Sequence, residues 1–460
     1  MSDVYIIYPR ENVNITQQLY ELLSQQWEVW WDDNIVGEWG PAIEENLAKT
    51  KCVVALFSEF SRKATVTDEL RVAQKHTQNI IGLRIDESDP PYPFGSLTSI
   101  DLQGWNGDST HPSFLQLQRK IARVVLPRKA PSRLLATIGS NLPIPNIFMS
   151  VSSHETQFSP ADALEVLRVH QTSSILVSAY DLVKSPDKSE MLEKIKAYRK
   201  EGGFVLIDSG NYEARRLKDE GWKPINYRQA LRDTPHDWAF CFDVAKPSPD
   251  PEKAIEQIVK AVKRDSKYTY APMLPIVHVS QDAAGLSRLP VVVKGVSERL
   301  NPQVIAIPER ELGAGLVARA NTMKKIRKTL DELPYYQPVH LLGTGNPWSI
   351  AVLVAAGADT FDGLEWCRFA IDPRRARLHH FQHFDFFKNS GERTPFLKMV
   401  DAQPAIEYAG RVAFYNLEYY AEFGQLMRSM VSTQDAEPFA TGVTRMFSNE
   451  LRKLFPEVFP

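Results

Sequence analysis

Apolar and polar positions follow two different patterns along the first 125 residues of the chain, one typical of strands and one typical of helices. Four short runs have the near-continuous hydrophobicity of strands buried in a parallel sheet, and they occupy residues 4–8, 28–32, 52–58 and 80–86. Stretches with helical spacing lie between and after them, at residues 15–23, 41–49, 66–76 and 112–125. Strands that alternate with helices predict an α/β fold with a doubly wound parallel sheet, whose ligands bind beyond the carboxyl ends of the strands.

A second region, from about residue 145 onward, repeats this alternation with a longer period. Its eight apolar runs occupy residues 147–153, 174–181, 204–210, 238–245, 273–279, 304–310, 339–345 and 360–366. Helical stretches such as 188–201 and 251–264 separate many of these runs. Eight such repeats are what a (β/α)8 barrel of the TIM type requires, and an open sheet is the alternative.

The length and one linker-like stretch divide the chain. A chain of 460 residues exceeds what one hydrophobic core usually organises, so we expect at least two domains. Residues 126–135 contain two prolines and three basic side chains directly after a helical pattern. We therefore predict a first domain over residues 1–126, a linker over 127–140, and a barrel with C-terminal helices over 141–460.

Charge and cysteine usage narrow the class of protein. The formal net charge of −2 and the pI near 6.6 argue against a broadly basic nucleic-acid coat. Cys52, Cys241 and Cys367 are too far apart in the sequence for a CxxC metal site or a disulfide framework. The N-terminus has no basic leader, and the chain has no apolar run of about 18 residues. We expect a cytoplasmic protein without a membrane partner.

Polar and aromatic residues follow the strands of the first region. In chain order they are Tyr8, Arg10, Trp31, Asp33, Trp39 and Ser58. Glu69 lies early in the next helix, where a lone glutamate is commonly a solvated residue that favours the helix dipole. Trp30 and Trp31 alternate across a strand, so one of the two is expected in the core.

The order of these motifs resembles a TIR domain over its full length. The family's FISY-type strand is matched by YIIY, its VWxD strand by VWWDD, its G-x-W loop by GEWGP, and its VLS strand and glutamate-bearing helix by ALFS and TDEL. The resemblance implies a flavodoxin-like domain that cleaves the nicotinamide–ribose bond of NAD+, with Glu69 as the catalytic carboxylate. The sequence departs from the family at Thr65, where a tryptophan is frequent.

The chemistry that this resemblance implies needs few groups. A carboxylate near the ribose stabilises the oxocarbenium-like transition state while nicotinamide leaves. Trp31 or Trp39 would stack on nicotinamide or adenine, and Arg10 would meet a phosphate. The remaining residues of the predicted NAD+ site are Tyr8, Asp33 and Ser58. Many TIR domains are adaptors, so a non-catalytic scaffold is an alternative.

Polar residues also follow the strands of the second region. They are Asp208, Asp243, His278, Glu309, Arg310, Gly343 and Asp362, with Tyr212 close behind the first. In (β/α)8 barrels the residues at these strand ends are the default catalytic candidates. One aspartate after a strand often only caps the following helix, but three at equivalent ends predict a site.

This region carries a second resemblance, to tRNA-guanine transglycosylases, from about residue 140 to 430. DSGNY at 208–212 is similar to the family's DSGGF/Y motif, and the segments 239–249, 340–363 and 412–430 resemble its FDE strand, its LxGVG…DMFD segment and its closing HNL helix. The resemblance implies that Asp362 attacks C1′ of a nucleoside, that Asp208 is the general acid/base and that Asp243 reads the base. Tyr212 would stack on a purine, and His278 would contact the base.

Three departures from that family indicate an altered ligand. The cysteine triplet of its zinc site is absent and Tyr415 stands at the position of its histidine, so no zinc is expected. Pro308, Glu309 and Arg310 replace its glycine-rich base pocket, and Asn211 replaces the second glycine of DSGG. The basic segment 372–377 is either a phosphate contact or a solvated loop, and the nearby His379, His380 and His383 do not predict a metal site.

The leading hypothesis from the sequence is an NAD+ glycohydrolase effector, of the antiphage type. In it, the barrel senses a nucleotide, deazapurine or nucleic acid, and the TIR domains of several copies assemble and release nicotinamide. A second hypothesis makes the barrel a base-exchange enzyme on DNA or RNA through Asp362, with the TIR domain as an assembly module. A third makes both halves non-catalytic. The loss of the zinc site favours the first.

Overall fold

The computed structural model describes residues 3–24, 27–31, 44, 46–77, 79–97, 99–109, 111–125, 137–138, 142–154, 156–280, 282–391 and 393–433. The chain divides into two compact units. The first unit consists of residues 1–141 with 331–336, and the second unit of residues 142–330 with 337–460. The predicted linker over 127–140 lies almost entirely outside the described residues, so the domain boundary stays a prediction.

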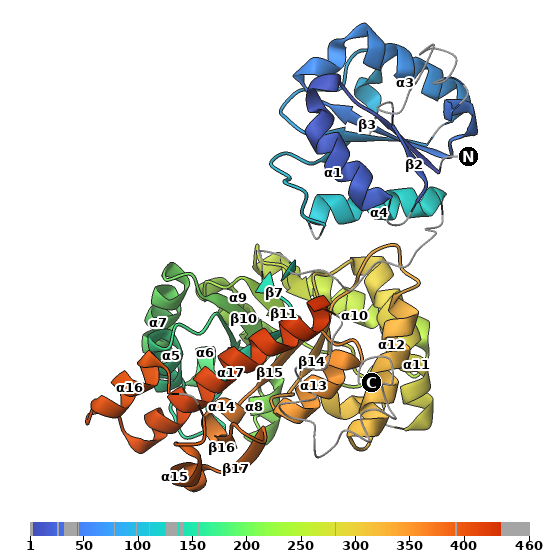
Figure 1. The fold of residues 1–460 in the computed structure, drawn as a ribbon. Helices are drawn as coiled ribbons and strands as arrows, with labels where there is room; N and C mark the ends of the chain where they lie inside the picture. The colour runs from blue at the N-terminus through green and yellow to red at the C-terminus, as the bar shows by residue number, and fades with distance from the viewer. Residues whose placement is uncertain are drawn as a thin grey trace. The chain divides into compact units, whose positions relative to one another are not determined.

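The first unit is the predicted doubly wound parallel sheet (Figure 1). Its strands are β1 (Val4–Ile7), β2 (Val29–Trp30), β3 (Cys52–Phe57), β4 (Ile80–Arg84) and β5 (Ser99–Asp101). Its helices include α1 (Val13–Leu23), α3 (Ala64–His76) and α4 (Pro112–Val124). The strand order β2-β1-β3-β4-β5 is the flavodoxin-like order. The sequence pattern missed β5, and the predicted helix over 41–49 falls mainly outside the described residues.

The two faces of this sheet are covered by different helices, as Figure 1 shows. Val4 and Ile6 of β1 pack in one core cluster with residues of α1 and α4. Tyr5 and Ile7 pack in another cluster with residues of α3. Successive side chains of a strand point to opposite faces, which explains why every residue of β1 is apolar and buried.

The second unit contains the eight predicted strands. They are β8 (Asn146–Val151), β9 (Ser174–Ser178), β10 (Phe204–Asp208), β11 (Trp238–Phe240), β12 (Met273–Leu274), β13 (Ile305–Pro308), β14 (Val339–Leu342) and β15 (Thr360–Gly363). The helices between them are α5 (Pro160–Val169), α6 (Ala179–Lys184), α7 (Lys188–Lys200), α8 (Asn211–Arg216), α9 (Pro224–Asp233), α10 (Pro251–Asp265), α11 (Ala283–Leu300), α12 (Leu316–Leu330) and α13 (Pro347–Ala355). A two-stranded sheet of β6 (Thr137–Ile138) and β7 (Leu142–Pro143) precedes β8.

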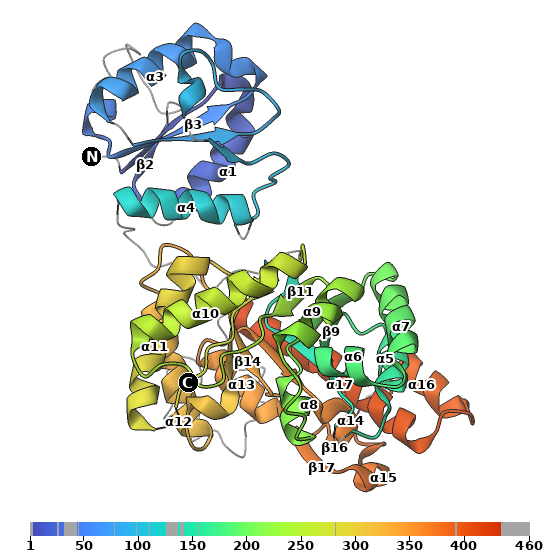
Figure 2. The same ribbon diagram turned by 180° about the vertical axis from the view of Figure 1, so that it is seen from behind.

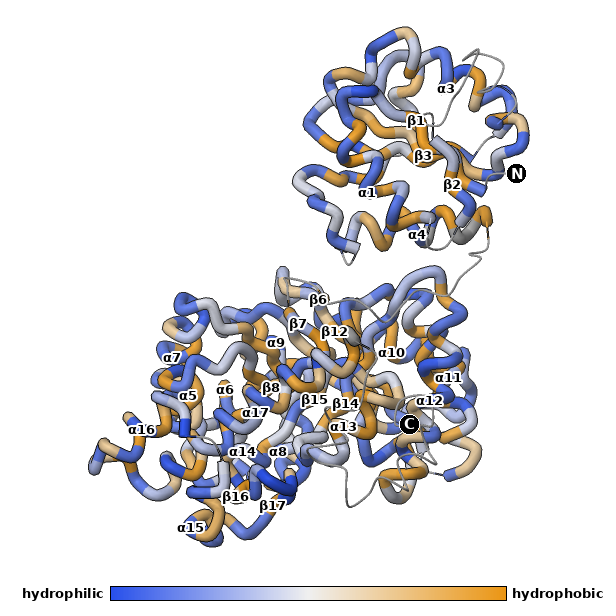
Figure 3. Tube along the Cα trace, viewed as in Figure 1, coloured by the Kyte–Doolittle hydropathy of each residue, from blue (hydrophilic) through white to orange (hydrophobic). Residues whose placement is uncertain are grey.

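These eight strands form a parallel barrel rather than an open sheet (Figure 2). The sheet runs in the order β12-β11-β10-β9-β8-β15-β14-β13, and a parallel bridge between Ile276 and Ala306 joins its two ends. Two backbone hydrogen bonds support that bridge, because Val277 N donates to Ala306 O and Ala306 N donates to Pro275 O, at 2.8 and 3.0 Å. The strands are the hydrophobic centre of the unit in Figure 3.

The chain after β15 forms a hairpin and a set of helices. These elements are α14 (Glu365–Arg368), β16 (Phe369–Asp372), β17 (Arg377–His380), α15 (Phe384–Phe387), α16 (Pro395–Ala402) and α17 (Tyr408–Thr433). Asn416 of α17 ties this part together, since its Nδ2 donates to the carbonyls of Trp366 and Phe369 at 2.9 and 2.7 Å. Tyr420 donates to the carbonyl of Gly345 at 2.6 Å. In the described part of the chain, none of the helices has the length and apolar character needed to cross a membrane.

A buried ion pair links three segments of the second unit. Arg327 of α12 donates to Asp359 Oδ2 at 2.9 Å and to the carbonyls of Gly357 and Gln337. Asp359 in turn accepts the backbone N–H of Val339, the first residue of β14, at 2.9 Å. The guanidinium therefore fixes the start of β14 against the loop before β15.

We expect Arg327→Ala to destabilise this part of the barrel by about 3 to 5 kcal/mol, because Asp359 would stay buried without its charge partner. Hydrogen exchange of peptides from β13 to β15, followed by mass spectrometry, measures this loss locally. Lys328→Ala, on the exposed side of the same helix, is the matched control. Equal protection of both variants would contradict the structural role of the ion pair.

Candidate functional site

One cavity gathers the polar ends of the barrel strands. Alternate residues of a strand point to the same side. Ser150 of β8 and Ser152, directly after that strand, therefore line the cavity together with Asp208 and Asp362. The cavity has a volume of about 450 Å³. The predicted residues that line it are Asp208, Tyr212, Asp243, His278, Glu309, Arg310, Gly343 and Asp362. The structure thus brings all eight predicted barrel residues to one place, while their roles stay predictions.

Asp362 is held at the cavity wall by three hydrogen-bond donors. Its carboxylate accepts from Ser150 Oγ at 3.0 Å, from His340 Nε2 at 3.1 Å and from the backbone N–H of Gly343 at 2.9 Å. Gly343 has a φ of +73°, a left-handed conformation that suits glycine. The side chain of Asp362 is thereby oriented before any ligand arrives, as a nucleophile or an anionic stabiliser requires.

Asp208, at the end of β10, is suited to donate a proton. Burial, together with the nearby carboxylates of Glu213 and Asp243, raises the pKa of Asp208 to about 8. Its Oδ2 also accepts the backbone N–H of Gly210 at 3.1 Å. A carboxyl group that holds its proton at neutral pH can act as a general acid, because it can donate that proton to a departing base.

Sequence reasoning missed two buried acids, Glu213, whose charge acts on Asp208, and Asp181, on which the charge of Glu213 acts. Glu213 of α8 accepts hydrogen bonds from the hydroxyls of Ser152 and Ser178 at 2.6 and 2.7 Å. Asp181 accepts the backbone N–H of Ser153 at 2.8 Å, and burial and the charge of Glu213 raise its pKa to about 7. The serines at alternate positions of one apolar strand were the available sequence signal for these two acids.

His278 bridges two carboxylates, one of which was not foreseen. Its Nε2 donates to Asp243 Oδ2 at 2.9 Å, and its Nδ1 donates to Glu311 Oε1 at 2.8 Å. Burial alone would lower the pKa of His278, but the two carboxylates outweigh it and raise that pKa to about 9. The pKa of Asp243 falls to about 2, because hydrogen bonds from His278, Asn211 and Ser209 outweigh its burial. His278 is therefore an imidazolium at neutral pH.

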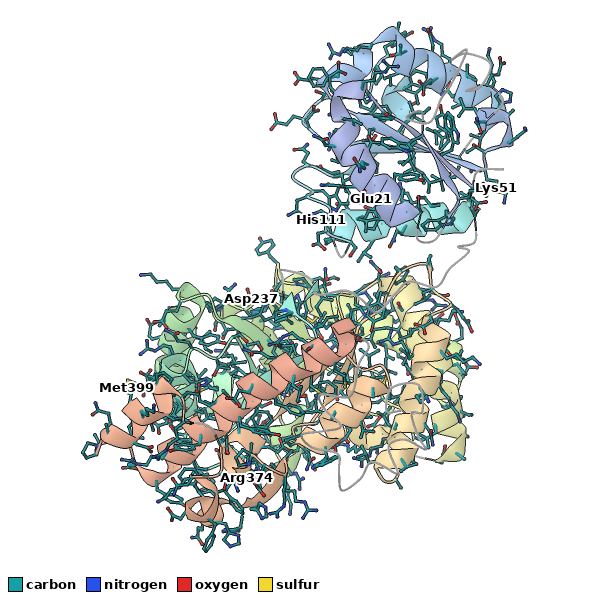
Figure 4. All side chains as sticks on the ribbon, viewed as in Figure 1. Glu21, Lys51, His111, Asp237, Arg374 and Met399 are labelled. Carbon is teal, nitrogen blue, oxygen red and sulfur yellow. The ribbon has the colours of Figure 1, made fainter. Side chains whose placement is uncertain are left out.

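The rim of the cavity is rich in arginine. Arg215, Arg216, Arg310, Arg319 and Arg368 all line it. Arg319 forms an ion pair with Glu309 at 2.9 Å, and the guanidinium of Arg216 lies 5.3 Å from the centre of the Tyr212 ring. Arg310 is exposed. Exposed guanidinium groups around a polar cavity are suited to bind phosphate oxygens. Figure 4 shows the side chains of the unit, with Asp237 marking the amino end of β11 and Arg374 the hairpin turn after β16.

In the first unit, Glu69 lies on α3 with only 8% of its surface exposed. Its Oε2 accepts a long hydrogen bond, of 3.4 Å, from the hydroxyl of the buried Tyr5. The ring of Tyr5 stacks on that of Trp30, with centroids 4.7 Å apart, and Trp30 is half-buried. Glu69 is therefore not a fully solvated helix residue, and its surroundings are aromatic.

The predicted NAD+-site residues are distributed unevenly. Trp31 and Tyr8 pack on each other and belong to the core cluster on the α1 and α4 face, away from Glu69. Ser58 caps the short helix after β3 by accepting from Phe60 N at 3.2 Å, and Arg10 is exposed at the start of another short helix. Asp33 and Trp39 lie outside the described residues. The structure thus places Trp30, rather than Trp31, on the Glu69 side of the sheet.

Across the residues that the structure describes, His, Cys, Asp and Glu side chains do not come together in groups of three or more that could hold a metal ion. Of the histidines near the basic segment 372–377, His379 stacks on Phe387 with ring centroids 4.4 Å apart. The ring centroids of His380 and His383 are 5.6 Å apart.

Comparisons with known proteins agree with both resemblances. Residues 4–117 match the family model for the TIR domain, so the first unit is a TIR domain. The chain is also similar to the tRNA-guanine(15) transglycosylase of Sulfolobus acidocaldarius, with 24% identity over 266 residues. That alignment covers 55% of this chain and 51% of the archaeal protein, so the chain spans about half the length of the curated relative that it matches. The fusion of a TIR domain to a transglycosylase-like region is thereby confirmed.

The pH dependence of His278 tests the charge assignment in the cavity. A histidine whose pKa is raised from about 6.5 stabilises the fold fully below that value, and this stabilisation is lost as the pH rises through about 9. We therefore expect the ring ¹³Cε1 resonance of His278 to titrate near pH 9, with His278→Gln identifying the signal. His76, exposed on α3, is the internal control. A titration of His278 near or below 6.5 would contradict the bridge between the two carboxylates.

Proposed function

We propose that the TIR domain cleaves the nicotinamide–ribose bond of NAD+ with Glu69 as the catalytic carboxylate, and that ligand binding in the barrel cavity controls this activity. The observation that carries the proposal is the environment of Glu69: a largely buried carboxylate, in contact with Tyr5 and on the same side of the sheet as Trp30. The TIR family match supports it, because enzymatic TIR domains use the matching glutamate.

The surroundings of Glu69 fit the chemistry. Loss of nicotinamide leaves positive charge on the ribose, and a carboxylate in a weakly hydrated position stabilises that charge more strongly than one in open water. The Tyr5 hydroxyl restrains the carboxylate from the sheet side. The half-buried ring of Trp30 offers a surface on which nicotinamide or adenine stacks.

Several contacts in the barrel support sensing rather than base exchange. Both oxygens of Asp243 are already engaged, one by His278 and the other by Ser209 and Asn211. Glu309 is paired with Arg319 at the position where the transglycosylase family keeps a glycine-rich pocket. A carboxylate with its own protein partners is not available to read an incoming base. The barrel therefore binds a nucleotide, deazapurine or nucleic acid as a signal, and self-association of the TIR domains follows, as in antiphage effectors.

Base exchange on DNA or RNA is the second candidate, and one observation favours it. Asp362 is oriented by three donors while Asp208 retains a proton near neutral pH. This combination provides a nucleophile and an acid in one cavity, as glycosyl transfer requires. In that case the TIR domain acts as an assembly module. A scaffold in which neither unit is catalytic is the third candidate.

Nicotinamide release tests the first candidate. We expect full-length protein with lysate from phage-infected cells to release nicotinamide, and Glu69→Gln to lose at least about 100-fold of that rate, as losses of catalytic carboxylates commonly do. Asp68→Asn, an exposed neighbour on the same helix, should keep it. Asp362→Ala should lower the triggered rate of the full-length protein, because that residue lines the barrel cavity and lies outside the TIR domain. Release that survives Glu69→Gln, or none in any condition, would overturn the proposal.

Incorporation of a radiolabelled base into DNA or RNA separates the second candidate. Exchange catalysed by the barrel would be abolished by Asp362→Asn and would survive Glu69→Gln. We expect no incorporation by the wild-type protein, because Asp243 and Glu309 already have protein partners. Incorporation that depends on Asp362 would show that the barrel is the enzyme.

A further inference from the structure

Glu365 is a carboxyl group in the barrel cavity that neither the sequence patterns nor the family resemblance assign. It is the first residue of α14, three residues after Asp362, and it lines the same cavity. Its Oε2 is buried, and among the described residues no side chain or backbone group forms a hydrogen bond with that atom. Buried polar atoms in folded proteins nearly always have a partner, so such an atom in a residue that lines a cavity indicates a bound group. Glu309 Oε1, of the same cavity, also accepts no hydrogen bond among the described residues, but it has the guanidinium of Arg319 at 2.9 Å.

The backbone around Glu365 is built to admit its carboxyl group. A Cβ atom at Gly345 or at Gly363 would overlap Glu365 Oε2. Any residue other than glycine at these two positions would push the carboxyl group away. Tyr420 fixes the first glycine by donating to its carbonyl at 2.6 Å. The two glycines therefore leave room for the carboxyl group, although Oε2 gains no hydrogen bond from any described residue there.

The charges around Glu365 favour a cation. Among the described residues, Asp208, Glu213 and Glu365 form no ion pair, while Asp243 and Glu309 have His278 and Arg319. Burial, with the carboxylates of Asp362 and Glu309, raises the pKa of Glu365 to about 7, against a hydrogen bond from its own backbone N–H and the charge of Arg368. A carboxyl group in such surroundings gains most from a ligand that brings positive charge and an N–H donor.

We infer that Glu365 Oε2 accepts a hydrogen bond from a cationic N–H group of the barrel ligand, an ammonium or an amidinium. This inference rests on the proposed ligand-binding role of the cavity, and it names the chemical class of the ligand's inner end. The exposed Arg310 and Arg216 at the rim suit an anionic outer end of the same ligand. Glu365 is thus a residue that determines ligand specificity.

Titration calorimetry with benzamidine and benzamide tests the inference. The two probes have the same planar shape, but only benzamidine is cationic at pH 7. We expect the full-length protein to bind benzamidine at least about 10-fold more tightly, a difference of about 1.4 kcal/mol. Glu365→Gln should bind the two equally, and Glu298→Gln, an exposed residue of α11, should behave as wild type. Far-ultraviolet circular dichroism confirms that each variant is folded, and Glu365→Asp, which keeps the charge, should retain part of the preference.

Proton release provides a readout that a merely structural role would not change. The groups that act on Glu365 or feel its charge are Asp362, Glu309, Arg368, Cys367 and Tyr420. Burial raises the pKa of both Cys367 and Tyr420, so these two stay neutral at pH 7. Binding of a cation should ionise Glu365 and release about half a proton at pH 7, since the group titrates near that pH when free.

Calorimetry in two buffers of different ionisation enthalpy counts these protons. The difference between wild type and Glu365→Gln isolates the contribution of Glu365 from that of Asp208. Equal affinity of wild type for both probes, or a preference and proton release that survive Glu365→Gln, would overturn the inference. Such a result would leave triggered nicotinamide release intact, whereas Glu365-dependent binding without nicotinamide release would overturn only the proposed function.

Discussion

The site of the second unit depends on one constraint: carboxyl groups must be accommodated where little water reaches them. Removing an ionised carboxylate from water is costly unless it is paired, hydrogen-bonded or protonated. The cavity uses each of these solutions. Asp243 is paired with the imidazolium of His278, Glu213 is bound by two serine hydroxyls, and Asp208 keeps its proton through a raised pKa. Within the described residues, Glu365 Oε2 has neither a hydrogen bond nor an ion pair, and for that reason we assign it to a ligand.

The regular alternation of the parallel strands makes this arrangement possible. In β8, Phe148 faces the barrel interior and lies 5.9 Å from the ring of His340, while Ser150, two residues later, reaches Asp362. The apolar layer closes the barrel below, and the polar layer above forms the cavity wall. A shift of the register of β8 by one residue would turn these inward-facing side chains toward the helices, and the side chains that now face the helices would enter the barrel. The stability of the barrel and the geometry of its site are therefore set by the same pairing.

Sequence patterns were sufficient for the fold because hydrophobic runs report burial directly. All eight barrel strands and the four predicted strands of the first unit are present, whereas β5, three residues with one buried side chain, was too short and polar to detect. The predicted barrel residues line one cavity because the ends of parallel strands converge, and their roles stay predictions. Glu311 escaped prediction because its partner His278 is 33 residues away, and only the fold brings them together. Similarly, the alternation of side chains along a strand predicts that one of Trp30 and Trp31 lies in the core. It does not say which of the two, and the structure shows that it is Trp31.

The two leading functions place different thermodynamic requirements on ligand binding in the barrel. If the barrel is a sensor, its ligand must bind more tightly to the state in which the TIR domain cleaves NAD+ than to the inactive state. That coupling is reciprocal, so occupancy of the TIR site must strengthen ligand binding in the barrel by the same factor. A base-exchange enzyme carries no such requirement, because its cavity has only to bind the transition state of its own reaction. The internal partners of Asp243 and Glu309 argue against that second task, and they leave Glu365 for the cationic ligand that we propose. The distribution of charge partners in the barrel thus favours a receptor that acts through Glu69 over a second, independent active site.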